Sequence, residues 1–236
     1  MKRPLFGALV LTLAVAPPTS ACSGGAPEIE GASAAIGGPR FRVEVLREGR
    51  RVVLLRDQEP LLVLAEDAFE LGVVDELDEG ASYDPWALEQ RGDEALGVTF
   101  VRPRSFRAER DADGEGAWIA LAYGEGLRAE AHVRHVEGAT FTVELRPGAV
   151  EAGPFVALAR VRARTSGDPR EGFYGLGEWQ DSVDHRGKLR PMQIEPDPEI
   201  ESVNNENHVP VPLLVGTRGW GIFAASTRVG AFDVAR

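Results

Sequence analysis

Apolar and polar residues alternate with a period of two over most of this chain. In residues 127–134 every second residue is apolar, and those between are charged or histidine. This pattern predicts a β-strand with one face on a core and the other in water. Residues 141–145 repeat the pattern and Gly138 lies between the two runs, so we expect an antiparallel hairpin. In residues 159–164 small apolar residues alternate with arginines, which predicts a further strand.

Short strands of this kind are expected along the whole chain, separated by Gly, Pro and Asp. Further candidates are residues 41–46, 51–56, 61–64, 69–74, 98–102, 118–123, 211–215, 221–225 and 230–234. Many short strands predict two antiparallel sheets packed face to face, an all-β sandwich rather than a parallel α/β fold. The one predicted helical turn spans residues 84–90, where Asp84 suits the N-cap and Pro85 the first helical position.

The first 21 residues have the features of a secretory signal peptide. Lys2 and Arg3 precede an uncharged apolar run, residues 5–16, which is too short to span a bilayer as a helix. The sequence Thr19-Ser20-Ala21-Cys22 follows. It resembles the lipobox of bacterial lipoproteins, whose cysteine is lipidated, although Thr19 stands where the lipobox usually has Leu. We expect either a lipoprotein of the bacterial cell envelope anchored through Cys22, or a secreted protein cleaved near Ala21. Both interpretations predict export.

The amino-acid composition and length restrict both the fold and the possible binding partners. Cys22 is the only cysteine, so no intramolecular disulfide forms and the fold depends on an apolar core. Residues 22–38 predict a flexible linker, and residues 39–236 are long enough for one β-sandwich domain. The formal net charge of −11 becomes −13 if Lys2 and Arg3 leave with the acid-free signal peptide. This charge argues against nucleic acid as a partner and leaves a lipid anchor as the expected membrane contact.

Candidate chemistry gathers between Glu178 and His208, in a long loop without periodicity. Carboxylates, amides, guanidinium groups and an aromatic ring are the groups that bind sugars, and this loop contains all of them. Its leading candidates for sugar contacts are Trp179, Asp181, His185, Arg186, Asp197 and His208. No pattern indicates a cofactor or a metal site. Residues 111–116 carry acids and glycines but lack the spacing of a calcium loop, so we interpret them as a hairpin turn.

Three motifs around this loop carry a family resemblance. They are Tyr174-Gly175-Leu176-Gly177-Glu178, Val209-Pro210 and Arg218-Gly219-Trp220-Gly221-Ile222. Their order resembles the N-terminal domain of glycoside hydrolase family 31, the α-glucosidase and α-xylosidase family. The resemblance implies a galactose mutarotase-like β-sandwich whose loop reaches over a catalytic (β/α)8 barrel. It also implies that Asp197, with Glu195 as a rival, corresponds to a loop aspartate. The family's Trp-Asn-Asp type sequence is replaced here by Met192-Gln193-Ile194-Glu195-Pro196-Asp197-Pro198, which leaves the substrate open.

No residue of this sequence is assigned a catalytic role. Retaining hydrolysis of a glycosidic bond needs two carboxyl groups about 5 Å apart, and the resemblance implies that both come from the barrel. No segment here alternates strand and helix as a barrel requires. We therefore expect a non-catalytic N-terminal domain or fragment of an exported glycoside hydrolase acting on α-glucosides or α-xylosides, which binds carbohydrate and packs on the barrel. The alternatives are a standalone surface-anchored carbohydrate-binding lipoprotein and a lipoprotein scaffold without a ligand.

Overall fold

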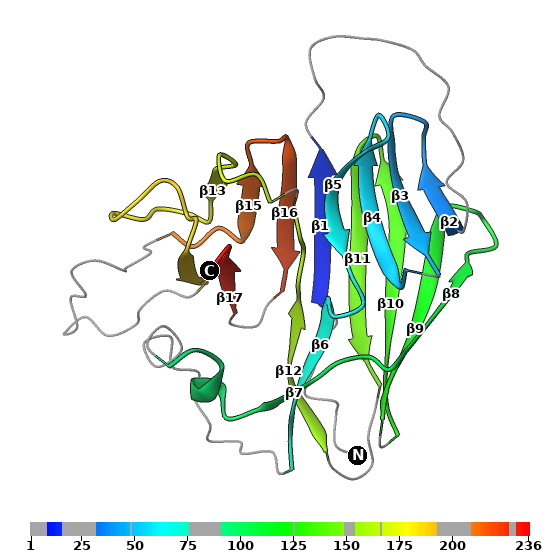
Figure 1. Ribbon diagram of the computed structural model, residues 1–236, viewed down its shortest axis with the longest axis horizontal. Helices are drawn as coiled ribbons and strands as arrows, with labels where there is room; N and C mark the ends of the chain where they lie inside the picture. Colours follow the sequence, from blue (N-terminus) through cyan, green and yellow to red (C-terminus); the bar gives the residue numbers. More distant parts are fainter. Residues whose placement is uncertain are drawn as a thin grey trace.

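Antiparallel strands are the dominant element of the computed structural model (Figure 1), which confirms the all-β prediction. The structure describes residues 9–15, 32–47, 49–75, 91–124, 126–148, 154–165, 167–192, 209–226 and 230–236. Among the described residues, one 3-10 helix, η1, spans Gly92–Leu96. The strands are β1 Leu9–Val15, β2 Ala32–Gly37, β3 Phe41–Leu46, β4 Arg51–Arg56, β5 Glu59–Leu64, β6 Phe69–Val74, β7 Thr99–Val101, β8 Ser105–Arg110, β9 Gly116–Gly124, β10 Leu127–Glu137, β11 Thr140–Pro147, β12 Phe155–Val161, β13 Phe173–Gly175, β14 Lys188–Pro191, β15 Leu213–Gly216, β16 Trp220–Ala225 and β17 Ala231–Val234.

The strands form one wide sheet and three smaller ones. The wide sheet has the order β13-β15-β16-β1-β11-β10-β9-β8. A four-stranded sheet, β2-β3-β4-β5, lies over the β8 to β11 part of it (Figure 1). The other two sheets have the orders β12-β6-β7 and β14-β17. The predicted hairpin of residues 127–145 is confirmed as β10 and β11, and the turn predicted at residues 111–116 joins β8 to β9.

The core lies between the wide sheet and the smaller sheets that face it. Ile119 and Val133 of the wide sheet are fully buried together with Ile36 of the four-stranded sheet. The alternation along β9 and β10 produces this burial, because every second side chain points inward. The Tyr123 hydroxyl donates a hydrogen bond of 3.0 Å to the Phe69 carbonyl oxygen and so ties β9 to β6. Burial raises the pKa of the Tyr123 hydroxyl.

The N-terminal part of the chain differs from the sequence-based prediction in two places. Residues 32–37, predicted to belong to a flexible linker, form β2, which pairs with β3 and buries Ala34 and Ile36. The small residues of β2 give a weak local signal, and burial against the core decides their conformation. Residues 9–15, within the predicted signal peptide, form β1 between β11 and β16. The helical turn predicted at residues 84–90 lies outside the described residues.

One other strand prediction needs correction. The strand predicted at residues 159–164 is β12, which ends at Val161 and pairs with β6. Arg160 of β12, Arg162 just after it and Arg102 surround the buried carboxylate of Glu70, to which Arg162 donates a hydrogen bond of 2.8 Å. β3 spans the predicted residues, and its Arg42 and Glu44 are buried and ion-paired at 2.7 Å, so this strand is buried on both faces.

The outer face of the wide sheet changes character across its width. Over β10 and β11 its outward residues are charged or polar, among them Arg128, Glu130 and Thr142. Over β13, β15 and β16 its outward residues are apolar, and the side chains between them along these strands point into the core. We call four of these residues the apolar face: Tyr174, Leu213, Val215 and Phe223, with exposed fractions of 38, 38, 37 and 39%.

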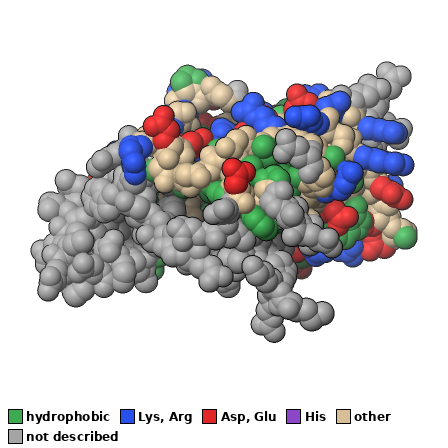
Figure 2. All heavy atoms as spheres, turned by 90° about the horizontal axis from the view of Figure 1, so that it is seen from below, with side chains coloured by type: hydrophobic (Ala, Val, Ile, Leu, Met, Phe, Trp, Pro, Cys, Tyr) green, Lys and Arg blue, Asp and Glu red, His purple; other side chains and the backbone are tan. Residues whose placement is uncertain are grey.

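Charged side chains elsewhere on the molecule are mixed. In the view of Figure 2, acidic and basic side chains are interspersed around small apolar areas rather than gathered into a basic patch. Many are paired: Arg164 with Asp67, Arg160 with Asp93 and Arg134 with Asp113.

Candidate functional site

The candidate loop begins at a sharp bend after β13. Gly175, Leu176 and Gly177 all have positive φ, with values of 105, 60 and 97°. A Cβ atom on Gly175 would lie 2.2 Å from the Leu213 carbonyl oxygen, so only glycine fits there. The Leu176 side chain is fully buried, and its N–H donates to the same carbonyl oxygen at 2.8 Å. The bend that the two glycines predict is therefore present, and it turns the chain from β13 into the loop.

Arg190 holds the described part of the loop together. Its side chain is 1% exposed, although it stands on the short strand β14. Its Nη2 donates to Asp181 Oδ1 at 2.8 Å and its Nε donates to His185 Nδ1 at 3.1 Å. Its guanidinium carbon lies 4.2 Å from the centre of the Trp179 ring, which is a cation–π contact. One buried cation thus contacts three of the residues that the sequence singles out.

His185 is neutral in this arrangement. Its Nε2 lies 2.8 Å from the Gly175 carbonyl oxygen, which only accepts hydrogen bonds, so Nε2 carries the proton. Its Nδ1 accepts from Arg190 Nε, which only donates. Burial lowers the pKa of the His185 imidazole, since the charged form would lose its hydration. The neutral ring therefore connects the β13 bend to Arg190.

Two aspartates of the loop are ionised and structurally engaged. Burial opposes ionisation of Asp181, but hydrogen bonds from Arg190 and Lys188 outweigh it, and the pKa of the Asp181 carboxyl lies below its ordinary value. Asp184 Oδ1 accepts from the N–H groups of Phe173 and Arg186 at 3.1 and 3.0 Å. These bonds outweigh partial burial and lower the pKa of the Asp184 carboxyl in the same way.

Arg186 connects the loop to the segment before β13. Its guanidinium donates to the carbonyl oxygens of Asp168 and Glu171 and lies 4.9 Å from the centre of the Phe173 ring. Glu171 is buried and accepts a hydrogen bond of 2.6 Å from the indole N–H of Trp220. The Arg218-Gly219-Trp220 motif and the bend are thereby joined in one network.

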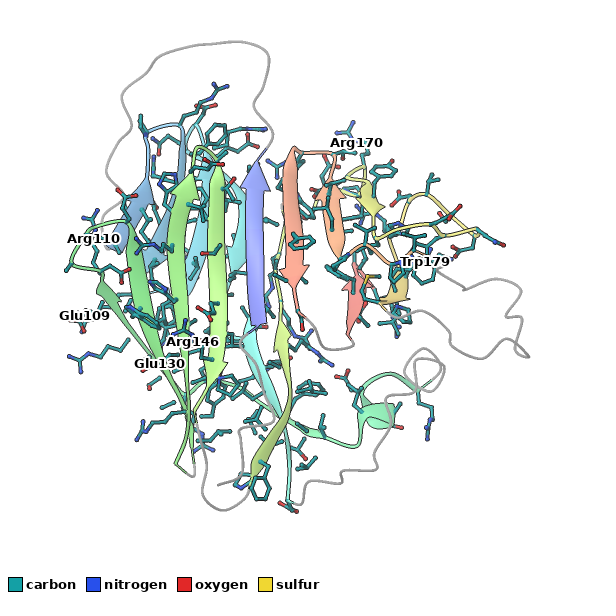
Figure 3. The ribbon with its side chains drawn as sticks, turned by 180° about the vertical axis from the view of Figure 1, so that it is seen from behind. Glu109, Arg110, Glu130, Arg146, Arg170 and Trp179 are labelled. Carbon is teal, nitrogen blue, oxygen red and sulfur yellow. The ribbon has the colours of Figure 1, made fainter. Side chains whose placement is uncertain are left out.

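The predicted sugar-contact residues fall into three groups. Trp179 and His185 are buried, at 9 and 2% exposure, and the Trp179 indole N–H is bonded to the Leu176 carbonyl oxygen at 3.0 Å. Asp181 and Arg186 reach the surface of the same cluster. Figure 3 shows Trp179 at the β13 edge of the wide sheet, far from Glu109 and Arg110 at the β8 edge. Asp197, its rival Glu195, His208 and the lipidation candidate Cys22 lie outside the described residues.

Sequence reasoning missed Arg190 and Glu171. Arg190 stands in Lys188-Leu189-Arg190-Pro191, which reads as an ordinary solvated strand. Glu171 stands in a polar turn before the first motif. Both side chains are buried by residues that are distant in the sequence, and a local sequence pattern does not reveal such contacts.

A second aromatic cluster lies on the polar half of the wide sheet. The rings of Trp118 and His132 are stacked with centres 4.0 Å apart, and His132 Nε2 lies 2.8 Å from Asp111 Oδ2. The Arg146 guanidinium carbon lies 5.3 Å from the centre of the Trp118 ring. Figure 3 shows Arg146 and Glu130 close together on this face. These groups are also of the kinds that bind sugars, so this face is a rival to the loop.

Other kinds of site are not supported in the part of the chain that the structure describes. The described residues contain no group of three or more His, Cys, Asp or Glu side chains placed to hold a metal ion. None of their helices is long and apolar enough to span a membrane. A pocket of about 410 Å³ has a mixed lining, with apolar side chains such as Val73, Val101 and Leu127 and polar ones such as Asp75, Thr99 and Arg104.

Comparisons with known proteins agree with these observations. The family model described as the glycosyl hydrolase 31 N-terminal galactose mutarotase-like domain matches residues 29–233. Two similar solved structures are GH31 dextranases of Flavobacterium johnsoniae, one a mutant complexed with isomaltotriose and one complexed with glucose. Each has 18% identity and a TM-score of 0.30 and covers 86% of this chain, which in turn spans 23% of that chain. No curated protein matches.

The family match includes every described strand except β1 and the last residue of β17. It also contains the bend at Leu176, the loop cluster and the Trp220 hairpin, which are the parts that carry the sequence resemblance. The chain therefore belongs to glycoside hydrolase family 31, whose N-terminal galactose mutarotase-like domain it contains.

Proposed function

We propose that this chain is the non-catalytic N-terminal domain of an exported glycoside hydrolase that acts on α-glucosides or α-xylosides. The family match supports a role beside a catalytic domain. The chemistry of the loop supports a non-catalytic role, because Asp181 and Asp184 are held by hydrogen bonds within the loop. Hydrolysis needs one carboxyl group with a raised pKa, whereas the pKa values of both are lowered.

The apolar face is the observation that carries this proposal. Tyr174, Leu213, Val215 and Phe223 stand side by side on three adjacent strands, and each is more than one third exposed. Large contiguous apolar areas on a folded domain usually mark an interaction surface. The charged half of the same sheet face has no such area. We propose that the apolar face packs on a (β/α)8 catalytic barrel.

The loop of residues 178–208 contributes the sugar contacts in this proposal. Asp181 and Arg186 lie at the surface of the described cluster and, with Asp197 and His208, supply the direct contacts. Trp179 and His185 are buried, so their role is to position the loop through Arg190. Since the described part of the loop is ordered by its own contacts, the site is partly preorganised, which lowers the entropic cost of binding.

Carbohydrate titration followed by NMR tests the loop directly. We expect maltose, isomaltose or a xylosyl sugar to shift the signals of Asp181 and Arg186, with a dissociation constant near the millimolar level. Asp181→Asn should weaken the shifts, and Glu130→Gln on the rival face should leave them unchanged. Shifts confined to Trp118 and His132 would contradict the loop assignment. They would favour the second candidate function, a standalone carbohydrate-binding lipoprotein, which the exposed polar groups around Trp118 would serve.

Export and anchoring through Cys22 complete the proposal. The small residues before the sole cysteine support it, and two acyl chains on one residue are enough for stable membrane attachment. Cys22→Ser should release the protein from the envelope into the soluble fraction. A wild-type protein that is already soluble after export would contradict the anchor and leave ordinary secretion.

A further inference from the structure

Strand β1 occupies a central position in the wide sheet. It is antiparallel to both neighbours, β11 and β16, and pairs with six residues of each. It is the strand that connects the β8 to β11 part of the sheet to the part made of β13, β15 and β16. Figure 1 shows it in blue between these two parts.

The register defines what this position requires. Leu9, Leu11 and Leu13 are paired with Leu145, Val143 and Phe141 of β11. These three β11 residues are buried. The residues of β1 between them are paired with Thr140, Thr142 and Glu144, which belong to the outer face. Because side chains alternate across a strand, the position requires a strand of about seven residues that is apolar at every second residue.

The residues that fill this position also belong to the predicted signal peptide. Its removal would separate β11 from β16 and leave a row of unpaired N–H and C=O groups on each. Both edges would lie over the core, next to Phe141 and Ile222. Buried backbone groups without partners are costly, so the processed sheet requires another strand in the same place.

We propose that the position of β1 is an acceptor site for a β-strand, and that a strand of the catalytic domain occupies it in the exported protein. This occupant rests on the proposed function. The apolar face begins on β16, the strand that borders the open position, and continues onto β15 and β13. A catalytic domain that covers the apolar face would therefore lie next to the edge of β16, where the missing strand has to pair. Pairing by strand addition is a recurring mode of protein recognition.

The acceptor site is tested on the full chain, produced without export and carrying a specific protease site in residues 23–30. After folding and cleavage, the N-terminal fragment should remain bound through gel filtration. A labelled synthetic peptide of residues 8–16 should replace it, and the same peptide with Leu11→Pro should not, since proline removes a hydrogen-bond donor from the strand. Hydrogen exchange at Val143 and Ile222 should be at least about tenfold slower with the fragment or peptide bound.

Every outcome of this experiment decides between the alternatives. If the fragment leaves and hydrogen exchange at Val143 and Ile222 becomes fast, the acceptor site is supported when the wild-type peptide restores slow exchange and the proline peptide does not. If the fragment leaves and exchange at Val143 and Ile222 stays slow without peptide, or if the proline peptide binds equally well, the acceptor site is overturned.

The occupant is tested on the exported protein carrying Thr142→Cys beside the position. Crosslinking should join this residue to a strand of a catalytic domain. A crosslink between two copies of this chain would overturn the occupant, and so would a crosslink to another protein or the absence of any crosslink. If only the proposed function is wrong, the peptide still binds the acceptor site while no catalytic domain is crosslinked. If the acceptor site is wrong, the peptide experiment itself fails, so the two failures are distinguishable.

Discussion

At the scale of single residues, the loop depends on hydrogen bonds that keep His185 neutral. The ring donates to the Gly175 carbonyl oxygen and accepts from Arg190, so a proton on Nδ1 would face the Arg190 guanidinium. The pKa of His185 is accordingly lower in the folded chain than its ordinary value of 6.5. The unfolded chain binds this proton at a higher pH than the folded chain does, so proton binding favours unfolding as the pH falls.

We expect the free energy of unfolding to decrease as the pH falls below about 6.5 and to level off below the folded-state pKa of His185. Glutamine accepts and donates in a similar way but does not titrate, so His185→Gln should reduce this decrease. Urea unfolding at a series of pH values measures it. His135→Gln, a change near the end of β10 beside Phe141, is the matched control and should leave the decrease in place. Equal slopes for the wild type and His185→Gln would contradict the account.

The same residues show why the site was only partly predictable. Trp179, Asp181, His185 and Arg186 were chosen for the chemistry of their side chains, and the structure brings all four into one region. The sequence does not show that two of them are buried, because this depends on Arg190, whose burial comes from contacts across the loop. The sequence shows the chemical type of each side chain, whereas the solvent exposure of that side chain depends on the fold.

At the scale of elements, the glycines of the first motif have a direct steric role. We expect Gly175→Ala to lower the free energy of unfolding by about 3 kcal/mol, because a Cβ atom there meets the Leu213 carbonyl oxygen at 2.2 Å and φ is 105°. Gly138→Ala in the β10–β11 turn is the matched control. Its φ is 52° with nothing within 4 Å, so it should cost about 1 kcal/mol. Urea midpoints that shift equally for both variants would refute the steric role.

Element prediction succeeded where alternation is strong and failed where burial is decided elsewhere. β3, β4 and β6 begin and end at the predicted residues, because β-branched and aromatic residues there are bounded by turn residues. β2 was predicted as linker, since Ala-Ser-Ala-Ala has little β-propensity of its own, and its pairing with β3 determines its conformation. β8 was not predicted because Phe106 is its only buried residue.

At the scale of the whole molecule, the outer face of the wide sheet has a polar half and an apolar half, and we propose that the apolar half packs on a partner. Charged rows cover β10 and β11, while Tyr174, Leu213, Val215 and Phe223 remain exposed on the strands beyond β1. Composition predicted an acidic domain, the alternation predicted an all-β fold, and the resemblance predicted a surface that packs on a barrel. None of these located that surface, because its position follows from the order of β13, β15 and β16 in the sheet.

The measurement that tests the central claim most directly is affinity purification of the tagged chain from its native host, with peptide sequencing and a glycosidase assay of the product. We predict that a polypeptide containing a (β/α)8 barrel accompanies the chain, covalently linked or bound, and that the purified material hydrolyses α-glucosides or α-xylosides. A bound barrel should be lost when Leu213→Lys and Val215→Lys are combined, whereas Glu130→Lys on the polar half should retain it. A chain that is isolated alone, with activity abolished by Asp181→Asn, would contradict the account.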